Sequence, residues 1–196
     1  MATYYHGTFR LFEKFDLDHA LEGDGKVKFG FGVYVTSKYP SAAHYSGSNP
    51  SALVHYVYTV EIPDVTPGNH LGFREPVDAS ILERASRALG EDIPGETAAQ
   101  GSLFRKWLAN RLTGRTGSVR KMTDRADLAG EKAAAAFLTG IGVDLLTWPT
   151  NWNRPEDGLN CAVMDDSKVR MVQVDTVELE GKAKLVEGSQ KLVKKF

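Results

Sequence analysis

The sequence has few of the features that mark several large classes of protein. Its 196 residues include one cysteine, Cys161, which excludes a disulfide within the chain and a zinc site built from several cysteines. No apolar run approaches the roughly 20 residues that span a bilayer. The first residues carry no basic segment followed by an apolar one, as a secretory signal would. We therefore expect a soluble, cytoplasmic protein without membrane contact.

The chain also has no excess of charge of either sign. Lys and Arg total 24 against 25 for Asp and Glu, which excludes a basic field over the whole molecule for gripping nucleic acid. A local basic segment lies between residues 105 and 125, which contain seven basic residues and one acidic residue. These are Arg105, Lys106, Arg111, Arg115, Arg120, Lys121 and Arg125, against Asp124. This segment is either a solvated surface or a patch that contacts phosphates of RNA, DNA or a dinucleotide.

Apolar periodicity predicts an α+β fold, since short strands occur at both ends of the chain with helices between them. Strands are expected over 3–8, 33–36 and 53–62, and a β-hairpin is expected from 160–164 and 169–174. Helices are expected over 41–45, 79–89, 102–112 and 127–138. Trp107 falls on the apolar face of its helix with Leu103 and Leu108, which favours a core position over a base-stacking one.

Three short motifs could carry chemistry. In the first, His6-Gly7-Thr8, a histidine on a strand is followed by a glycine that lets a ligand approach the backbone closely, and the Thr8 hydroxyl adds a donor and an acceptor. A lone histidine of this kind is more often a structural residue, so this motif is weak by itself.

The second motif covers residues 29–36 and contains Gly30 and Gly32. Phe31 and Tyr34 could offer flat faces to a planar heterocycle. The pattern is neither a dinucleotide-binding fingerprint nor a phosphate-binding loop, because the glycines do not open a helix and no Gly-Lys-Ser/Thr follows. A glycine-bulged core strand is the structural alternative.

The third motif begins at Asn160, a polar residue that enters an apolar strand ending in the acidic turn at Asp165 and Asp166. A plain hairpin, with Asn160 capping the preceding loop, is the structural alternative. Cys161 is not favoured as a nucleophile, because alternation places it on the face opposite Asn160. No metal site is expected, since His44, His55 and His70 lack ligand spacing.

Taken in this order, the three motifs resemble the ADP-ribosyltransferase superfamily in its His-Tyr-Glu branch, which contains the poly(ADP-ribose) polymerases and diphtheria-toxin-like enzymes. The similarity is closest to small bacterial and phage domains of toxins and polyvalent proteins. The family pattern is matched by His6-Gly7-Thr8, by Gly30 to Tyr34 with a helix ending in Tyr45, by a Gly-Ile-Gly segment at 140–142, and by residues 160–165 with the strand at 168–172.

The resemblance spans roughly residues 3–174. It implies a split antiparallel β-sandwich with short helices between its strands. We expect an ADP-ribosyltransferase-like domain over 1–175, with a helical insert at about 79–125, and an extension of the same domain over 176–196.

The resemblance implies an enzyme that uses NAD+ as co-substrate, without a metal, and transfers ADP-ribose to a macromolecule. His6 would bind the adenine-side ribose and the backbone of Gly7 the nicotinamide amide. Tyr34 and Tyr45 would enclose the nicotinamide ring. Thr8 and Ser41 would add hydroxyl contacts, and Gly32 would allow close approach. His6, Tyr34 and Asn160 are the implied catalytic residues.

Asn160 departs from the family pattern, in which many members have a glutamate that stabilises the cationic transition state. Three interpretations follow. The protein is a mono-ADP-ribosyltransferase that relies on positioning, or an acid from elsewhere enters the site, or the domain binds NAD+ or ADP-ribose without turnover. The candidate acids are Glu156, Asp157, Asp165 and Asp166.

The acceptor, protein or nucleic acid, stays open at this stage. Trp152, Asn153 and Arg154 precede the third motif in a loop that faces the acceptor in this family, and Arg115 and Arg120 belong to the basic segment. A toxin or phage-conflict effector is implied, acting in its own cytoplasm or delivered to that of a target cell, with an antitoxin or immunity protein as a further expected partner.

Overall fold

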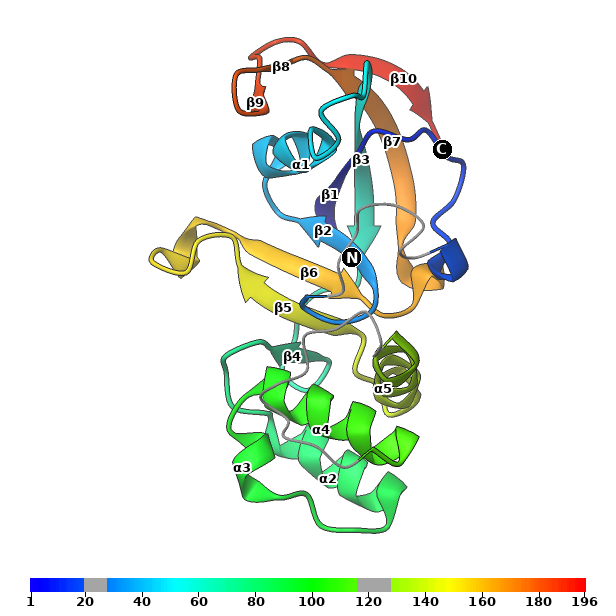
Figure 1. Cartoon of the computed structure of the whole chain (residues 1–196), viewed down its shortest axis with the longest axis vertical. Helices are drawn as coiled ribbons and strands as arrows, with labels where there is room; N and C mark the ends of the chain where they lie inside the picture. The colour runs from blue at the N-terminus through cyan, green and yellow to red at the C-terminus, as the bar shows by residue number, and fades with distance from the viewer. Residues whose placement is uncertain (20–27, 116–127) are drawn as a thin grey trace.

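A mostly antiparallel sheet of eight strands runs through the molecule in the order β10-β7-β3-β1-β2-β6-β5-β4 (Figure 1). The computed structural model describes residues 1–19, 28–115 and 128–196. The strands of this sheet are β1 Ala2–Thr8, β2 Val33–Thr36, β3 His55–Ile62, β4 His70–Gly72, β5 Leu145–Pro149, β6 Leu159–Val163, β7 Arg170–Val177 and β10 Lys191–Lys195. β8 (Leu179–Glu180) and β9 (Lys184–Leu185) form a separate pair. The expected α+β class is confirmed.

The sheet is nearly divided between β1 and β2. β1 pairs with β3 along its whole length, from Ala2↔Ile62 to Thr8↔Tyr56. With β2 it shares the single pair Tyr5↔Thr36 among the described residues. We call β10, β7, β3 and β1 the β1 half, and β2, β6, β5 and β4 the β2 half. The strands of the two halves run in clearly different directions (Figure 1).

A short helix, α1 (Tyr39–Ser46), covers the β1 half. Pro40 stands in its first turn, where a missing N–H costs nothing. Ala42 and Ala43 are fully buried against Val57 of β3. Small side chains let this helix lie very close to β1.

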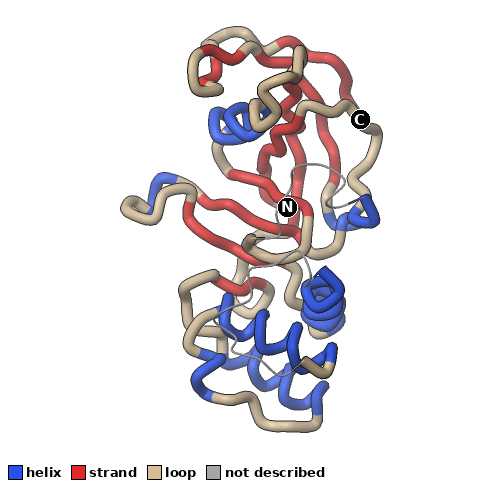
Figure 2. The backbone as a smooth tube through the Cα atoms, in the orientation of Figure 1, coloured by secondary structure: helices blue, strands red, loops and turns tan. Residues whose placement is uncertain are grey.

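The remaining helices gather against the β2 half (Figure 2). They are α2 Ala79–Leu89, α3 Gly95–Ala98, α4 Gly101–Thr113 and α5 Leu128–Gly140. Asp78 caps α2 by accepting the Ser80 N–H, and α2 and α4 each end at a glycine in the left-handed region, Gly90 and Gly114. Their apolar faces form one cluster with Leu146 and Trp148 of β5 and Ala162 of β6.

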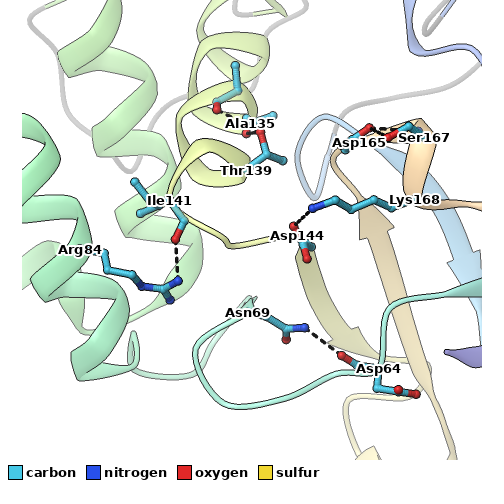
Figure 3. Close-up of polar contacts among 11 residues, drawn as sticks. Asp64, Asn69, Arg84, Ala135, Thr139, Ile141, Asp144, Asp165, Ser167 and Lys168 are labelled. Carbon is cyan, nitrogen blue, oxygen red and sulfur yellow. Dashed lines mark hydrogen bonds and ion pairs between the residues drawn. The ribbon is translucent and has the colours of Figure 1, made fainter.

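Polar contacts fix the chain where it enters β4 and β5 (Figure 3). Arg84 of α2 donates to the carbonyls of Ile141 and Gly68. Lys168, in the short 3-10 helix Asp166–Lys168, pairs with Asp144 at 2.6 Å. The last contact joins the segment between β6 and β7 to the start of β5.

Several elements match the sequence prediction. The helices expected over 79–89 and 102–112 are α2 and α4, and the strand at 33–36 is β2. Trp107 is partly buried and packs against the core, in agreement with the predicted position, and its ring stacks on Phe104 with centroids 6.0 Å apart. The helix expected over 127–138 is α5, although position 127 lies outside the described residues. No helix in the described ranges is long and apolar enough to cross a bilayer.

The predicted hairpin of residues 160–164 and 169–174 is wrong. β6 pairs with β2 and β5, whereas β7 pairs with β3 and β10, so the two strands lie in different halves. Both edges of β6 are occupied, and the 3-10 turn after Asp165 directs the chain across the split. β4, which pairs with β5, was not predicted from the sequence, and the tail after β7 adds β10 to the sheet, where it pairs with β7.

Candidate functional site

The three motifs meet at the split in the sheet. Thr36 of β2 lies opposite Tyr5 of β1 on one side and opposite Asn160 of β6 on the other, and Asn160 in turn lies opposite Trp148 of β5. Residues paired across a sheet project from the same face. Thr36, Asn160 and Trp148 are 2%, 4% and 7% exposed. Segments more than 120 residues apart therefore form one buried polar-aromatic row.

His6 is joined to the second motif by a hydrogen bond. Its Nδ1 lies 2.7 Å from the carbonyl oxygen of Tyr34. Because a carbonyl only accepts, Nδ1 carries the proton, and in the neutral ring Nε2 remains an acceptor. The imidazole packs edge-on against Phe15 at 5.1 Å and Phe12 at 6.0 Å. Burial lowers the pKa of His6 below its ordinary 6.5, so the ring is neutral at pH 7.

Gly7 is required by the packing of α1. A Cβ at this position would lie 1.6 Å from the carbonyl oxygen of Ala42. The space beside this glycine is thus filled by the helix. The neighbouring Thr8 uses its hydroxyl to accept the Arg10 N–H at 3.1 Å. Both residues therefore have local structural roles.

Tyr34 is held by the loop that precedes it. Its hydroxyl donates to the carbonyl of Gly30 at 2.8 Å and accepts the N–H of Phe29 at 3.1 Å. Its ring meets Trp148 edge-on at 5.4 Å, and Phe29 stacks on the same indole at 4.2 Å. Burial raises the pKa of Tyr34 to about 12, so its hydroxyl stays protonated.

The remaining residues expected to bind the nucleotide lie on α1 and at the start of β2. Ser41 is half-buried in the first turn of α1, where its N–H donates to the Lys38 carbonyl at 3.1 Å. Tyr45, in the last turn, is 54% exposed. A Cβ at Gly32 would lie 2.7 Å from the Val163 carbonyl oxygen. Among the described residues no ring contact joins Tyr34 to Tyr45.

The four candidate acids divide by position. Asp165 accepts the Ser167 N–H and Asp166 accepts the Leu17 N–H. Both follow the far end of β6, so they lie roughly 16 Å or more along the strand from Asn160. Glu156 is exposed and Asp157 pairs with Arg154 at 3.2 Å. These two precede β6 and lie at the end that bears Asn160.

The expected acceptor residues lie in two places. Trp152 is 38% exposed and carries the guanidinium of Arg74 over its ring at 3.9 Å. Asn153 donates its N–H to the side chain of Asn151 at 2.9 Å. Arg154, as noted, pairs with Asp157. Arg115 follows α4, its N–H donating to the Asn110 carbonyl, and Arg120 lies outside the described residues.

The basic segment at 105–125 is not a uniform surface. Arg105 is 3% exposed and pairs with Glu131 of α5 at 3.2 Å. Arg111 pairs with Glu91 at 2.6 Å. Neither interpretation offered from the sequence, a solvated face or a phosphate patch, describes Arg105.

The sequence pointed to neither Arg74 nor Glu131, and Arg105 was predicted only as a member of the basic segment, not as a buried residue. Arg105 lies three residues before Leu108 and next to Phe104, which are both fully buried. Helical spacing from Leu108 could have placed it on the buried face. Arg74 has no comparable signal, because its partner Trp152 is far away in sequence.

Cys161 is fully buried among Val33, Val35 and Val163 on the face opposite Asn160, as expected. Burial raises the pKa of its thiol to about 12, which keeps it protonated and unreactive. No group of three or more metal-ligating side chains occurs in the part of the chain that the structure describes.

A scan against protein-family models, a search of curated proteins and a search of solved structures each found no match.

Proposed function

We propose that the protein is an NAD+-dependent mono-ADP-ribosyltransferase whose site is the split between β1 and β2. The reaction breaks the bond between nicotinamide and ribose. ADP-ribose passes to a nucleophile of a macromolecular acceptor, while nicotinamide leaves and the acceptor gives up a proton. The fold assigned to this activity is the ADP-ribosyltransferase-like split sandwich.

The observation that carries the proposal is the meeting of the three motifs. β1, β2 and β6 lie side by side: His6 of β1 is hydrogen-bonded to the Tyr34 carbonyl of β2, and Thr36 of β2 lies opposite Asn160 of β6. The ladder between β1 and β2 is reduced to one pair beside His6 and Gly7. A sheet that separates there leaves backbone groups and side chains of both halves for a ligand to engage.

Each residue has a role that fits its chemistry. The neutral His6 offers Nε2 as an acceptor for a ribose hydroxyl, because Nδ1 is held by the Tyr34 carbonyl. The ring of Tyr34 is fixed at its hydroxyl and offers a flat face to nicotinamide. Tyr45 is exposed at the end of α1, and in the proposed complex it covers the nicotinamide ring from the other side. Holding the leaving group in this way favours cleavage by orientation.

The neutral side chain of Asn160 determines which type of ADP-ribosyltransferase we propose. Its Nδ2 has one long contact, 3.4 Å to the Pro149 carbonyl, so it retains donor capacity for a ribose hydroxyl. It supplies no negative charge to the oxocarbenium-like transition state. We therefore propose slow transfer of single ADP-ribose units rather than chain elongation. A domain that binds NAD+ or ADP-ribose without turnover is the second candidate, and the neutral Asn160 is the observation that favours it.

The test is transfer of label from NAD+ labelled in the adenylate moiety into a cell lysate, with portions treated by protease or nuclease. The proposal predicts label in macromolecules. Loss of label after protease identifies a protein acceptor, and loss after nuclease identifies a nucleic acid. Binding of NAD+ without label transfer or nicotinamide release would support the second candidate and contradict the first.

A further inference from the structure

A buried ion pair lies beside the proposed site. Arg105 of α4 and Glu131 of α5 pair at 3.2 Å, and their side chains are 3% and 7% exposed. Phe104 and Leu108 on α4 and Ala134 on α5, which stand close to the pair in sequence, are fully buried. The approach of Nη1 to Oε2 lacks hydrogen-bond geometry, and these two atoms and Arg105 Nε have no hydrogen-bond partner among the described residues. A pair of this kind contributes little net stability, since desolvation offsets the attraction.

The pair lies directly against the loop that holds Tyr34. A Cβ built on Gly30 would be 2.2 Å from Arg105 Nη1 and equally close to a methyl of Leu146. Gly30 also has φ at +118°, a conformation that other residues rarely adopt. The backbone of the loop thus rests on the guanidinium and leaves room for no side chain.

Gly30 connects the ion pair to Tyr34 through a hydrogen bond. The Gly30 carbonyl accepts from the Tyr34 hydroxyl, and the same hydroxyl accepts from Phe29 N–H. A chain of direct contacts therefore runs from α5 and α4 through the loop to the tyrosine. The two charges influence the Tyr34 hydroxyl in opposite senses, Arg105 favouring its ionised form and Glu131 its neutral one. Because these two influences oppose each other, the pair changes the protonation of the Tyr34 hydroxyl little. The role left to the pair is steric.

We propose that Arg105 and Glu131 are positioning residues: they set the Gly30 loop and so orient the Tyr34 ring toward nicotinamide. This inference rests on the proposed function for its effect on turnover. Its structural part, the dependence of the loop on the pair, does not.

The test replaces both charges together, as Arg105→Met with Glu131→Leu, because apolar replacement of a buried pair is often neutral or stabilising. The matched control is Glu83→Leu with Arg87→Met, which removes an exposed pair on α2. Thermal unfolding is expected to change by less than about 5 °C in either variant. The buried double variant should lower kcat/KM for nicotinamide release by on the order of tenfold or more, because small misplacements are costly in catalysis.

Hydrogen–deuterium exchange at the Phe29 amide gives a readout independent of activity. The double variant should exchange there on the order of tenfold faster than the wild type, since the Tyr34 hydroxyl no longer protects the amide. Tyr34→Phe should cause the same faster exchange. When Tyr34→Phe is added to the double variant, kcat/KM should stay at the value of the double variant, as expected for residues that act through one contact.

Wild-type kcat/KM and wild-type Phe29 exchange in a folded double variant would overturn the inference. If the double variant does not fold, Arg105→Lys keeps the positive charge opposite Glu131 but removes the Nη1 that lies against Gly30, and unchanged exchange at Phe29 in it would overturn the inference equally. An inactive wild-type protein whose Phe29 amide still depends on the pair would refute the proposed function while supporting the link from the pair to the loop.

Discussion

The two halves of the sheet hold their polar groups at the split in different ways. In the β1 half, His6 is enclosed by rings, and its hydrogen bond to the Tyr34 carbonyl is the polar contact that orients it. In the β2 half, Tyr34 is fixed at its hydroxyl by a loop that rests on a buried ion pair. Burial keeps both groups neutral at pH 7.

The two halves position their side chains by different kinds of contact. The β1 half relies on close backbone packing, because α1 lies against Gly7. The β2 half relies on a relay of contacts from two helices. Substitutions that disturb the packing of α1 on Gly7 should therefore act mainly on stability, and substitutions in the contacts that hold Tyr34 mainly on turnover.

The largest expected effect is in the β1 half. Gly7→Ala places a methyl where the Ala42 carbonyl lies and forces α1 away from β1. We expect a loss of about 3 kcal/mol or more in the free energy of unfolding, measured by urea denaturation. Gly140→Ala is the matched control, because a Cβ there meets nothing within 4 Å. Equal stability of the two variants would contradict the packing described for α1.

The next effect is in the β2 half. Asn160→Asp is nearly isosteric and places a carboxylate beside the ribose in the proposed complex. Because a negative charge acts mainly on the cationic transition state, kcat for nicotinamide release should rise about tenfold with little change in KM. Steady-state kinetics measure this split. A rise in KM with unchanged kcat would show that Asn160 does not face the reacting bond.

Acid sensitivity should distinguish His6 from an exposed histidine. The pKa of His6 is lowered in the folded chain, so the unfolded chain binds an extra proton as the pH falls below 6.5. Stability is therefore expected to fall from about pH 6.5 downward, until the lower folded pKa is reached. His6→Asn should remove this decline in plots of unfolding free energy against pH. The control is His44→Asn, and a decline that persists in His6→Asn would be contrary to the burial described for His6.

The smallest effect is expected at the exposed loop before β6. Trp152→Ala removes the ring under Arg74, a contact worth about 0.5–1 kcal/mol at an exposed position. Label transfer to the acceptor should fall about fivefold, more than nicotinamide release falls. Leu53→Ala, at a residue that is 98% exposed, is the control. An equal loss in transfer and release would place Trp152 at the nucleotide rather than at the acceptor.

Local patterns predicted local elements well. Apolar periodicity predicted the strand β2 and the helices α2 and α4. The predicted hairpin after Asn160 failed because strand partners are chosen by the whole sheet. β2 and β5 already pair with β6, and no local signal records that.

The strands that carry the three motifs are neighbours in the sheet, and the contacts of their residues could be described only from the structure. The glycine of the first motif was expected to admit a ligand, and the structure places the Ala42 carbonyl beside it. Arg105 was counted among surface basic residues, because charge in a sequence indicates exposure unless a partner is known. That partner, Glu131, lies on another helix, 26 positions further along the chain.

The most direct test of the account is nicotinamide release from NAD+ by the purified protein, compared with His6→Ala and Tyr34→Ala. The account predicts release by the wild type that depends on time and enzyme concentration, and its loss in both variants while each remains folded by circular dichroism. Absence of release from the wild type, or equal release from all three proteins, would contradict the placement of an NAD+-cleaving site at the split between β1 and β2.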